Sequence, residues 1–260
     1  MTEALIALPF GLAIGLIVGG VGGGGAILAL PVLVYVLGAG VGPASTASLI
    51  VVAVAAAVGA GALAFRGHVC WVLALTFSAP AAATSPLGAI AGTAVSPRVL
   101  VLTFIPLMLV AAAGTWRRAE GADAEETGDC PAPSWSRIIL AGCGLGLLTG
   151  FFGVGGGFLI VPVLTLWLDM SFRRAVATSL VILTLTGAAA LASHLVTGSG
   201  INVPVTVALA GSTALGALVG TMVGRRLPSQ HLGHALSVVV TAVALLLLVD
   251  TLFFGGPPSG

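Results

Sequence analysis

The sequence predicts an all-α polytopic membrane protein with two inverted-topology repeats, each a glycine-tipped helical hairpin followed by three transmembrane helices. Composition, an internal duplication and the distribution of arginines together predict this fold. Of the 260 residues, 58% are hydrophobic and 7% are charged, which leaves too little polar surface to cover a soluble globule. Continuous apolar runs of about 20 residues recur, as expected for helices that cross a hydrocarbon core about 30 Å thick. Such runs favour helices over barrel strands, whose residues alternate.

The duplication is visible when the second half is shifted back by 131 positions. The stretch "GVGGGFLIVPVL" (153–164) then lies over "GGGGAILALPVL" (22–33), and "ATSL" (177–180) lies over "TASL" (46–49). Recurrence at one fixed offset indicates a repeated structural unit.

The elements follow in chain order from these apolar runs. The first run begins after Met1–Glu3 with no basic residue and no cleavage site, so we expect a first span and not a signal peptide. The segment 117–136 reads as a solvated linker, because it contains prolines and five of the eight acidic residues. The first repeat is expected over 1–116, with a hairpin at 4–38 and spans at 44–64, 70–92 and 98–116. The second is expected over 137–254, with a hairpin at 138–168, spans at 174–195, 203–223 and 232–254, and a tail at 255–260.

The arginines decide whether the chain turns back at the glycines. All nine basic residues are arginines, and basic residues gather in cytoplasmic loops. If each glycine-broken stretch crossed the membrane once, four arginines would lie on one side and five on the other. If each is a hairpin, eight share one side and only Arg98 lies opposite, and all four tryptophans fall at the arginine-rich interface. We therefore predict hairpins, with both termini outside the cytoplasm and the linker 117–136 inside it.

A hairpin tip at membrane depth suggests a ligand site. Its peptide groups are tolerated only where protein or a water-filled cavity surrounds them, and the following helix points its N–H groups and positive dipole end at that place. Inverted repeats with interrupted helices are typical of transporters that hold substrate near the midplane. We therefore predict that backbone and hydroxyl groups bind a small anion, and that Pro31 and Pro162 shape the hairpins. The predicted substrate-binding residues are Gly22, Gly24, Gly25, Ser45, Thr46, Ser48, Gly153, Gly155, Gly156, Gly157, Thr178 and Ser179.

Five candidate residues, some in the predicted binding site and some outside it, have two interpretations each. Ser48 and Ser179 either contact ligand or bond back to their own helix. His194 either carries a coupling proton or is an interfacial histidine. Arg173 and Arg174 either attract anions to a cytoplasmic mouth or form an ion-paired cluster with Asp169.

Two further features are expected to be structural. The glycines spaced four apart in "GLAIGLIVG" (11–19) and "GALVGTMVG" (216–224) suit close helix packing. The three cysteines, Cys70, Cys130 and Cys143, show no metal-ligand spacing and are expected to be small apolar fillers or loop residues.

The second-half motif is similar to that of a known family. "GFFGVGGGFLIVPVL" followed by "RRAVATSL" resembles the TauE/SafE family of sulfite exporters, also called the toluene-sulfonate uptake permease family, and the resemblance extends over residues 4–254 apart from the linker. It implies a transporter of small sulfur-containing anions, such as sulfite, thiosulfate, sulfoacetate or other organosulfonates, in the bacterial inner membrane. The first copy has Ala26 and Ala47 where the second has Gly157 and Thr178, so the two halves of the site are expected to be unequal.

We therefore predict a secondary transporter that works by alternating access around a site between the two hairpin tips. A passive anion channel and a transporter of a different small carboxylate or oxyanion are the alternatives. A membrane chaperone would need spare loops or soluble domains, and an enzyme would need a convergent set of His, Cys or carboxylate groups, and the sequence provides neither. The expected partners are a small anion, the lipid bilayer and a coupling proton or sodium ion, with no cofactor, metal or nucleic acid. The particular anion, the direction of transport and the oligomeric state stay open.

Overall fold

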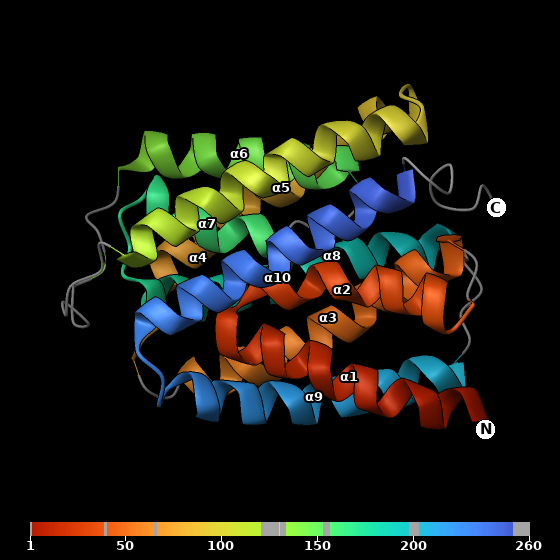
Figure 1. The fold of residues 1–260 in the computed structure, drawn as a ribbon. Coiled ribbons are helices and arrows are strands. Elements are labelled where there is room, and N and C mark those ends of the chain that lie inside the picture. The colour runs from red at the N-terminus through yellow and green to blue at the C-terminus, as the bar shows by residue number, and fades with distance from the viewer. Residues whose placement is uncertain are drawn as a thin grey trace.

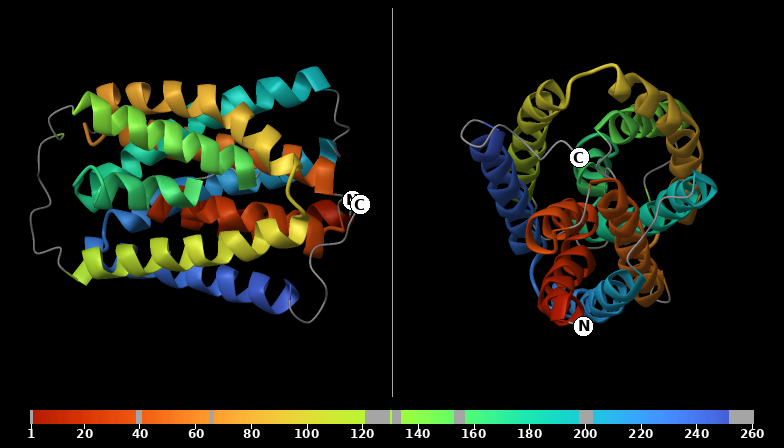
Figure 2. Two further views of the ribbon diagram at one scale, coloured as in Figure 1. Left: turned by 90° about the horizontal axis from the view of Figure 1, so that it is seen from above. Right: turned by 90° about the vertical axis from the view of Figure 1, so that its right-hand side faces the viewer.

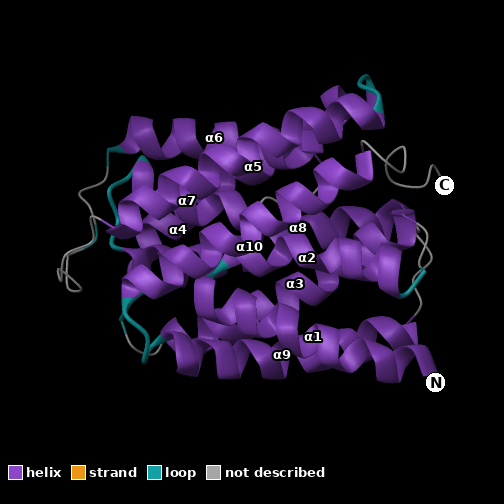
Figure 3. Ribbon diagram, viewed as in Figure 1, coloured by secondary structure: helices purple, strands orange, loops and turns teal. Residues whose placement is uncertain are grey.

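The structure is a computed structural model that describes residues 2–38, 41–64, 67–120, 130, 134–152, 157–197 and 203–251. All of the regular secondary structure in these residues is helical (Figure 3). In the first half the elements are α1 (Thr2–Val21), the 3-10 turn η1 (Gly23–Gly25), α2 (Ala26–Pro31), the π-helical turn η2 (Val32–Val36), α3 (Val41–Ala64), α4 (Trp71–Thr93) and α5 (Pro97–Glu120). In the second half they are α6 (Trp135–Phe152), α7 (Gly157–Leu166), α8 (Phe172–Thr197), α9 (Val203–Gly224) and α10 (Ser229–Val249).

Seven of the described helices are long and apolar enough to cross a membrane: α3, α4, α5, α6, α8, α9 and α10. Three apolar segments are shorter, at Ala7–Val21, Gly23–Val34 and Gly157–Leu166. These short segments are three of the four predicted hairpin arms. The fourth arm, α6, has 18 residues and is long enough to cross by itself. The predicted all-α membrane class is therefore confirmed.

The chain reverses direction at the first glycine cluster (Figure 1). Gly22 has a φ of 83°, in the left-handed region where a Cβ is strained, and η1 then leads into α2. Pro31 ends α2 and is followed directly by the π-helical turn η2. Proline removes a backbone donor and clashes with the preceding turn, and a local π-helical turn accommodates that disturbance.

The second glycine cluster lies between α6 and α7, and residues 153–156 fall outside the described part of the chain. From there α7 returns toward the end of the bundle at which α6 begins (Figure 2). Pro162 lies inside α7 and is buried. Both hairpin arms of this half are therefore helical up to the glycines.

The first arm of each hairpin packs against a helix of the other half. α1 lies along α9, and α6 lies along α4. A methyl group on Gly216 would lie 3.1 Å from the Gly15 Cα, and one on Gly88 would lie 2.8 Å from the Phe151 backbone nitrogen. These backbones touch, so the prediction that the stripes 11–19 and 216–224 serve helix packing is confirmed.

The first half of helix α8 occupies the centre of the bundle. Nine consecutive residues, 175–183, are buried on every side of the helix, which marks a helix surrounded by protein. It packs against α3, and α5 packs against α10. The start of α1 and the end of α10 lie at one end of the bundle, and the helix ends joined by the connections α5 to α6, α7 to α8 and α9 to α10 lie at the other (Figures 1 and 2). The latter is called the arginine end, because Arg117, Arg118, Arg137, Arg173, Arg174, Arg225 and Arg226 lie at or beside those connections.

Candidate functional site

The first glycine tip packs directly against the start of α7. A methyl group on Gly23 would overlap the Gly157 carbonyl group, and one on Gly157 would lie 3.0 Å from the Gly23 carbonyl oxygen. Gly157 is the first residue of α7, so the positive end of that helix faces the first tip. The two glycine clusters therefore meet through backbone groups.

Ser179 of α8 lies against the same tip. A methyl group on Gly22 would lie 2.7 Å from Ser179 Oγ, and the serine side chain is fully buried. Ser179 Oγ donates a hydrogen bond of 2.8 Å to the Val176 carbonyl. The back-bonding interpretation therefore applies to Ser179. Its oxygen touches the tip, but its single hydroxyl proton is already used.

Thr178 faces a different neighbour, although it is adjacent to Ser179 in the chain. Thr178 Oγ1 accepts a hydrogen bond of 3.2 Å from the backbone N–H of Cys70, and the threonine is fully buried. In this structure it therefore supports the segment that precedes α4.

The remaining glycines of the first tip serve packing. A methyl group on Gly25 would lie 2.7 Å from the Val18 backbone nitrogen, and one on Gly24 would overlap the Leu236 side chain. Gly25 therefore packs within the first hairpin, whereas Gly22, Gly23 and Gly24 approach the second half of the chain, Gly24 through Leu236 of α10. Sequence reasoning included Gly22 in the site and omitted Gly23.

The first-half hydroxyls lie near the start of α3. Thr46 is buried and Ser48 is half-buried, and each has an interaction partner. Three of the predicted site glycines, Gly153, Gly155 and Gly156, fall outside the described residues, as do the side chains of Ser45 and His194.

A cavity of about 230 Å³ lies at the arginine end beside the first tip. Its lining includes Gly19 and Gly20 from the end of α1, together with the polar residues His68, Arg173, Thr221 and Arg225. His68 Nδ1 is buried and has no hydrogen-bond partner within the described part of the chain. Two guanidinium groups and an imidazole thus share one cavity, an arrangement suited to an anion.

The two arginines predicted at the mouth have separate roles. Arg173 lines the cavity and donates hydrogen bonds to the Arg225 and Leu227 carbonyls, at 3.0 and 2.9 Å. These carbonyls follow α9, so Arg173 caps the end of that helix. Arg174 Nη1 instead lies 3.3 Å from Cys130 Sγ. Asp169, the expected partner of both arginines, forms an ion pair with Arg118, with 3.2 Å between Asp169 Oδ1 and Arg118 Nη2.

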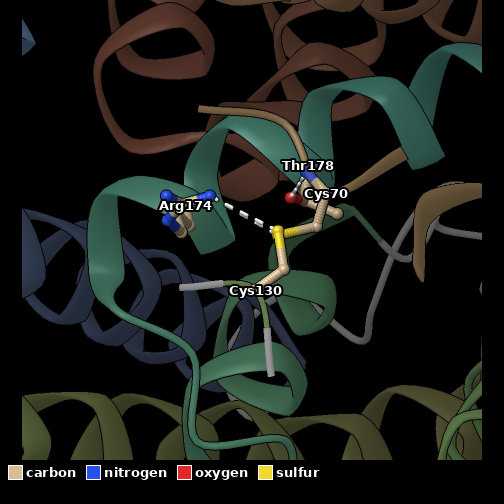
Figure 4. The surroundings of a disulfide bond; sticks show 4 residues. All are labelled: Cys70, Cys130, Arg174 and Thr178. Carbon is tan, nitrogen blue, oxygen red and sulfur yellow. Dashed lines mark hydrogen bonds between the residues drawn. A yellow bond between two sulfur atoms is a disulfide. The ribbon is translucent and has the colours of Figure 1, made fainter. Parts of the chain in front are cut away.

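Cys70 and Cys130 form a disulfide, with their Cα atoms 5.9 Å apart (Figure 4). Both cysteines lie in segments that connect helices, which fits the loop alternative of the sequence analysis, but the bond between them was not predicted. They are 60 residues apart, and sequence spacing does not reveal which distant segments the fold brings together. Cys143 is free and half-buried.

Sequence reasoning also missed the cavity residues His68, Thr221 and Arg225. His68 and Arg225 follow the ends of α3 and α9. The predicted topology places both helix ends at the same end of the bundle, and this was the only signal in the sequence that pointed to a common site.

The chain matches known membrane proteins along most of its length. A family model described as "Sulfite exporter TauE/SafE" matches residues 7–247. A relative in Xylella fastidiosa is 31% identical over 182 residues, which cover 68% of each chain. A relative in Methanocaldococcus jannaschii is 28% identical over 120 residues, which cover 43% of this chain and 45% of the relative. Both are described as probable membrane transporter proteins. No solved structure matches the chain. Because the family model extends from α1 to α10, the protein belongs to the sulfite exporter TauE/SafE family of membrane transporters.

Proposed function

We propose that this protein is a secondary transporter of small sulfur-containing anions, such as sulfite, thiosulfate, sulfoacetate or other organosulfonates. The observation that carries the proposal is the cavity beside the first glycine tip, lined by Arg173, Arg225 and His68. An oxyanion has several acceptor oxygens, and the guanidinium groups present planar sets of donors that match them. The anion enters from the arginine end and moves toward the tip.

Neutral groups hold the anion deeper in the protein. Beyond the cavity lie Gly22 and the N-terminal end of α7, and these contribute backbone dipoles without a fixed charge. A fixed positive charge at membrane depth would be costly. It would also bind the anion too tightly for the anion to be released on the other side. Charges at the mouth with dipoles inside therefore suit transport.

The proposed mechanism is alternating access between two inverted repeats. Its support is the reciprocal packing of α1 on α9 and of α6 on α4, together with hairpins that open toward opposite ends of the bundle (Figure 1). The contact between Gly23 and Gly157 closes the space between these parts of the two tips. A closed contact supports a transporter over a permanently open channel, because substrate passes only when the halves move.

The proposed orientation has the arginine end in the cytoplasm and both termini outside it, in a bacterial inner membrane. Seven of the nine arginines lie at or beside the connections of this end. The excess of arginine in cytoplasmic loops supports this orientation.

The test is transport by the purified protein in liposomes. Labelled sulfite and a panel of organosulfonates should accumulate with saturation. The variant Arg225→Gln should raise the KM by about fivefold, the effect of about 1 kcal/mol for an exposed charge. The matched variant Arg226→Gln changes a neighbouring arginine that does not line the cavity and should leave the KM unchanged. Transport of other anions with none of the sulfur panel would refute the substrate class, and a conductance without saturation would indicate a channel.

A further inference from the structure

The two sulfurs of the disulfide differ in their access to solvent. Cys70 precedes α4 and is 3% exposed. Cys130 lies between α5 and α6 and is exposed. A nucleophile that arrives from solution therefore meets Cys130 first.

A cation lies beside both sulfurs. Arg174 Nη1 is 3.3 Å from Cys130 Sγ and 3.9 Å from Cys70 Sγ (Figure 4). No carboxylate in the described residues pairs with Arg174. A neutral sulfur is a weak hydrogen-bond acceptor, so this charge stabilises the intact disulfide little. The positive charge of Arg174 does stabilise an approaching anion and a thiolate that forms beside it.

The proposed orientation places this disulfide on the cytoplasmic side. Disulfides are rare there, and those that occur are usually transient, catalytic or redox-sensing. A bond in that location is therefore expected to react and not to serve as a permanent link.

We propose that the Cys70–Cys130 disulfide is a reaction site for sulfite. The choice of sulfite rests on the proposed substrate class. The lone pair on the sulfite sulfur attacks Cys130 Sγ along the S–S axis and forms a new sulfur–sulfur bond, which makes Cys130 an S-sulfonate. The original S–S bond breaks, and its electron pair leaves on Cys70 as a thiolate. The sulfite sulfur is oxidised as the Cys70 sulfur is reduced, so no further reagent is needed.

Arg174 assists both ends of this reaction. Its guanidinium attracts the incoming anion to Cys130 and remains close to the sulfur of Cys70, where negative charge develops. Attack on the buried Cys70 sulfur would instead require sulfite to enter the protein. The S-sulfonate is therefore expected on Cys130 alone.

Cleavage of the disulfide is also expected to affect the cavity that Arg173, Arg225 and His68 line. Cys70 follows His68 by two residues, and its backbone N–H is bonded to Thr178 of α8. Cleavage removes the covalent bond that holds the segment carrying His68, which lines the cavity. The protein thereby senses its own proposed cargo at the face where the cargo enters.

The experiment uses the full-length protein, purified in detergent without reductant and treated with radiolabelled sulfite. Free thiols are trapped with a maleimide before and after treatment, so that Cys143, which is free throughout, is told apart from a newly released thiol. The sulfonate and maleimide sites are mapped by peptide mass spectrometry. We expect the sulfonate on Cys130 and the maleimide on Cys70. Arg174→Gln should slow the reaction about fivefold, as expected for loss of one half-buried charge near the reacting atoms, and Arg174→Lys should restore most of the rate. Size-exclusion chromatography shows whether each variant remains folded.

Three results would overturn the proposal: a sulfonate on Cys70, equal rates with and without the charge at position 174, or free thiols at both Cys70 and Cys130 in the untreated protein. The result is separable from the transport assay. Arg225→Gln, which is expected to weaken transport, should react at the normal rate. A protein that reacts with sulfite but carries none would retain this inference and lose the proposed function.

Discussion

Ala26 and Gly157 occupy the same place in the two repeats and meet each other in the structure, so we expect them to be energetically coupled. Gly157 aligns with Ala26 when the second repeat is shifted back by 131 positions. A methyl group on Gly157 would lie 3.2 Å from the Ala26 Cβ, closer than the roughly 3.5–4.0 Å at which carbon atoms attract each other. Only one of the two positions can therefore carry a methyl group without displacement of its neighbours.

The magnitude follows from three contacts. In Gly157→Ala the new Cβ would lie 3.2 Å from the Ala26 Cβ, 3.0 Å from the Gly23 carbonyl oxygen and 2.9 Å from Leu183 Cδ1. The leucine end can move, but the backbone oxygen cannot move easily, so we expect a loss of about 2 kcal/mol, within the range for overpacked cores. Ala26→Gly alone should cost about 1 kcal/mol through helix propensity. The double variant removes one of the three contacts and should be about 1 kcal/mol more stable than the sum of the single changes.

The assay is unfolding of the wild type, both single variants and the double variant in the same detergent, with sulfite uptake measured in liposomes. Gly144→Ala in α6 is the control, because a methyl group there meets nothing within 4 Å, and it should be neutral or slightly stabilising. Additivity of the two changes within about 0.3 kcal/mol would show that the positions are independent. It would also refute the contact between the tips on which the proposed mechanism depends.

Three further outcomes are expected. Thr178→Val should destabilise the protein in an unfolding assay by about 1–3 kcal/mol, because it leaves a buried backbone N–H without its acceptor, whereas Thr178→Ser should retain most of the stability. Gly220→Ala would place a methyl group on the α1 backbone and should reduce the yield of folded protein on size-exclusion chromatography, whereas Gly211→Ala in the same helix meets open space and should not. Cysteines introduced at Ala122 and Asn202 of a cysteine-free variant should be labelled from opposite faces of the membrane, and labelling from one face would contradict the proposed topology.

Composition and symmetry explain why much of the fold was predictable. The length of an apolar run indicates a membrane helix directly. The glycines at 22–25 interrupt such a run, and the chain of the structure reverses direction at that place. The arginine count draws on both halves together, so it favoured a hairpin over a single crossing, and the membrane orientation that it implies stays a prediction. These signals concern whole segments, and the structure agrees with them at that level.

Adjacent residues show where sequence reasoning fails. Thr178 and Ser179 were assigned one role as a pair, as were Arg173 and Arg174. Consecutive helical residues point about 100° apart, and each pair separates accordingly: Ser179 touches the first tip and Thr178 holds Cys70. A motif read as a unit therefore hides the direction of each side chain.

The same rotation gives α8 two functional faces. Arg173 and Val176 are three residues apart and line the anion cavity, whereas Arg174 and Thr178 are four apart and contact the two cysteines. Residues three and four apart share a face of a helix, so one face lines the cavity and the other contacts the two cysteines. Because 175–183 are buried on all sides, α8 cannot rotate or shift without moving its neighbours. If the proposed reaction changes the sulfur chemistry at one face, we therefore expect the helix to transmit that change to the cavity at the other, through a path no longer than its first two turns.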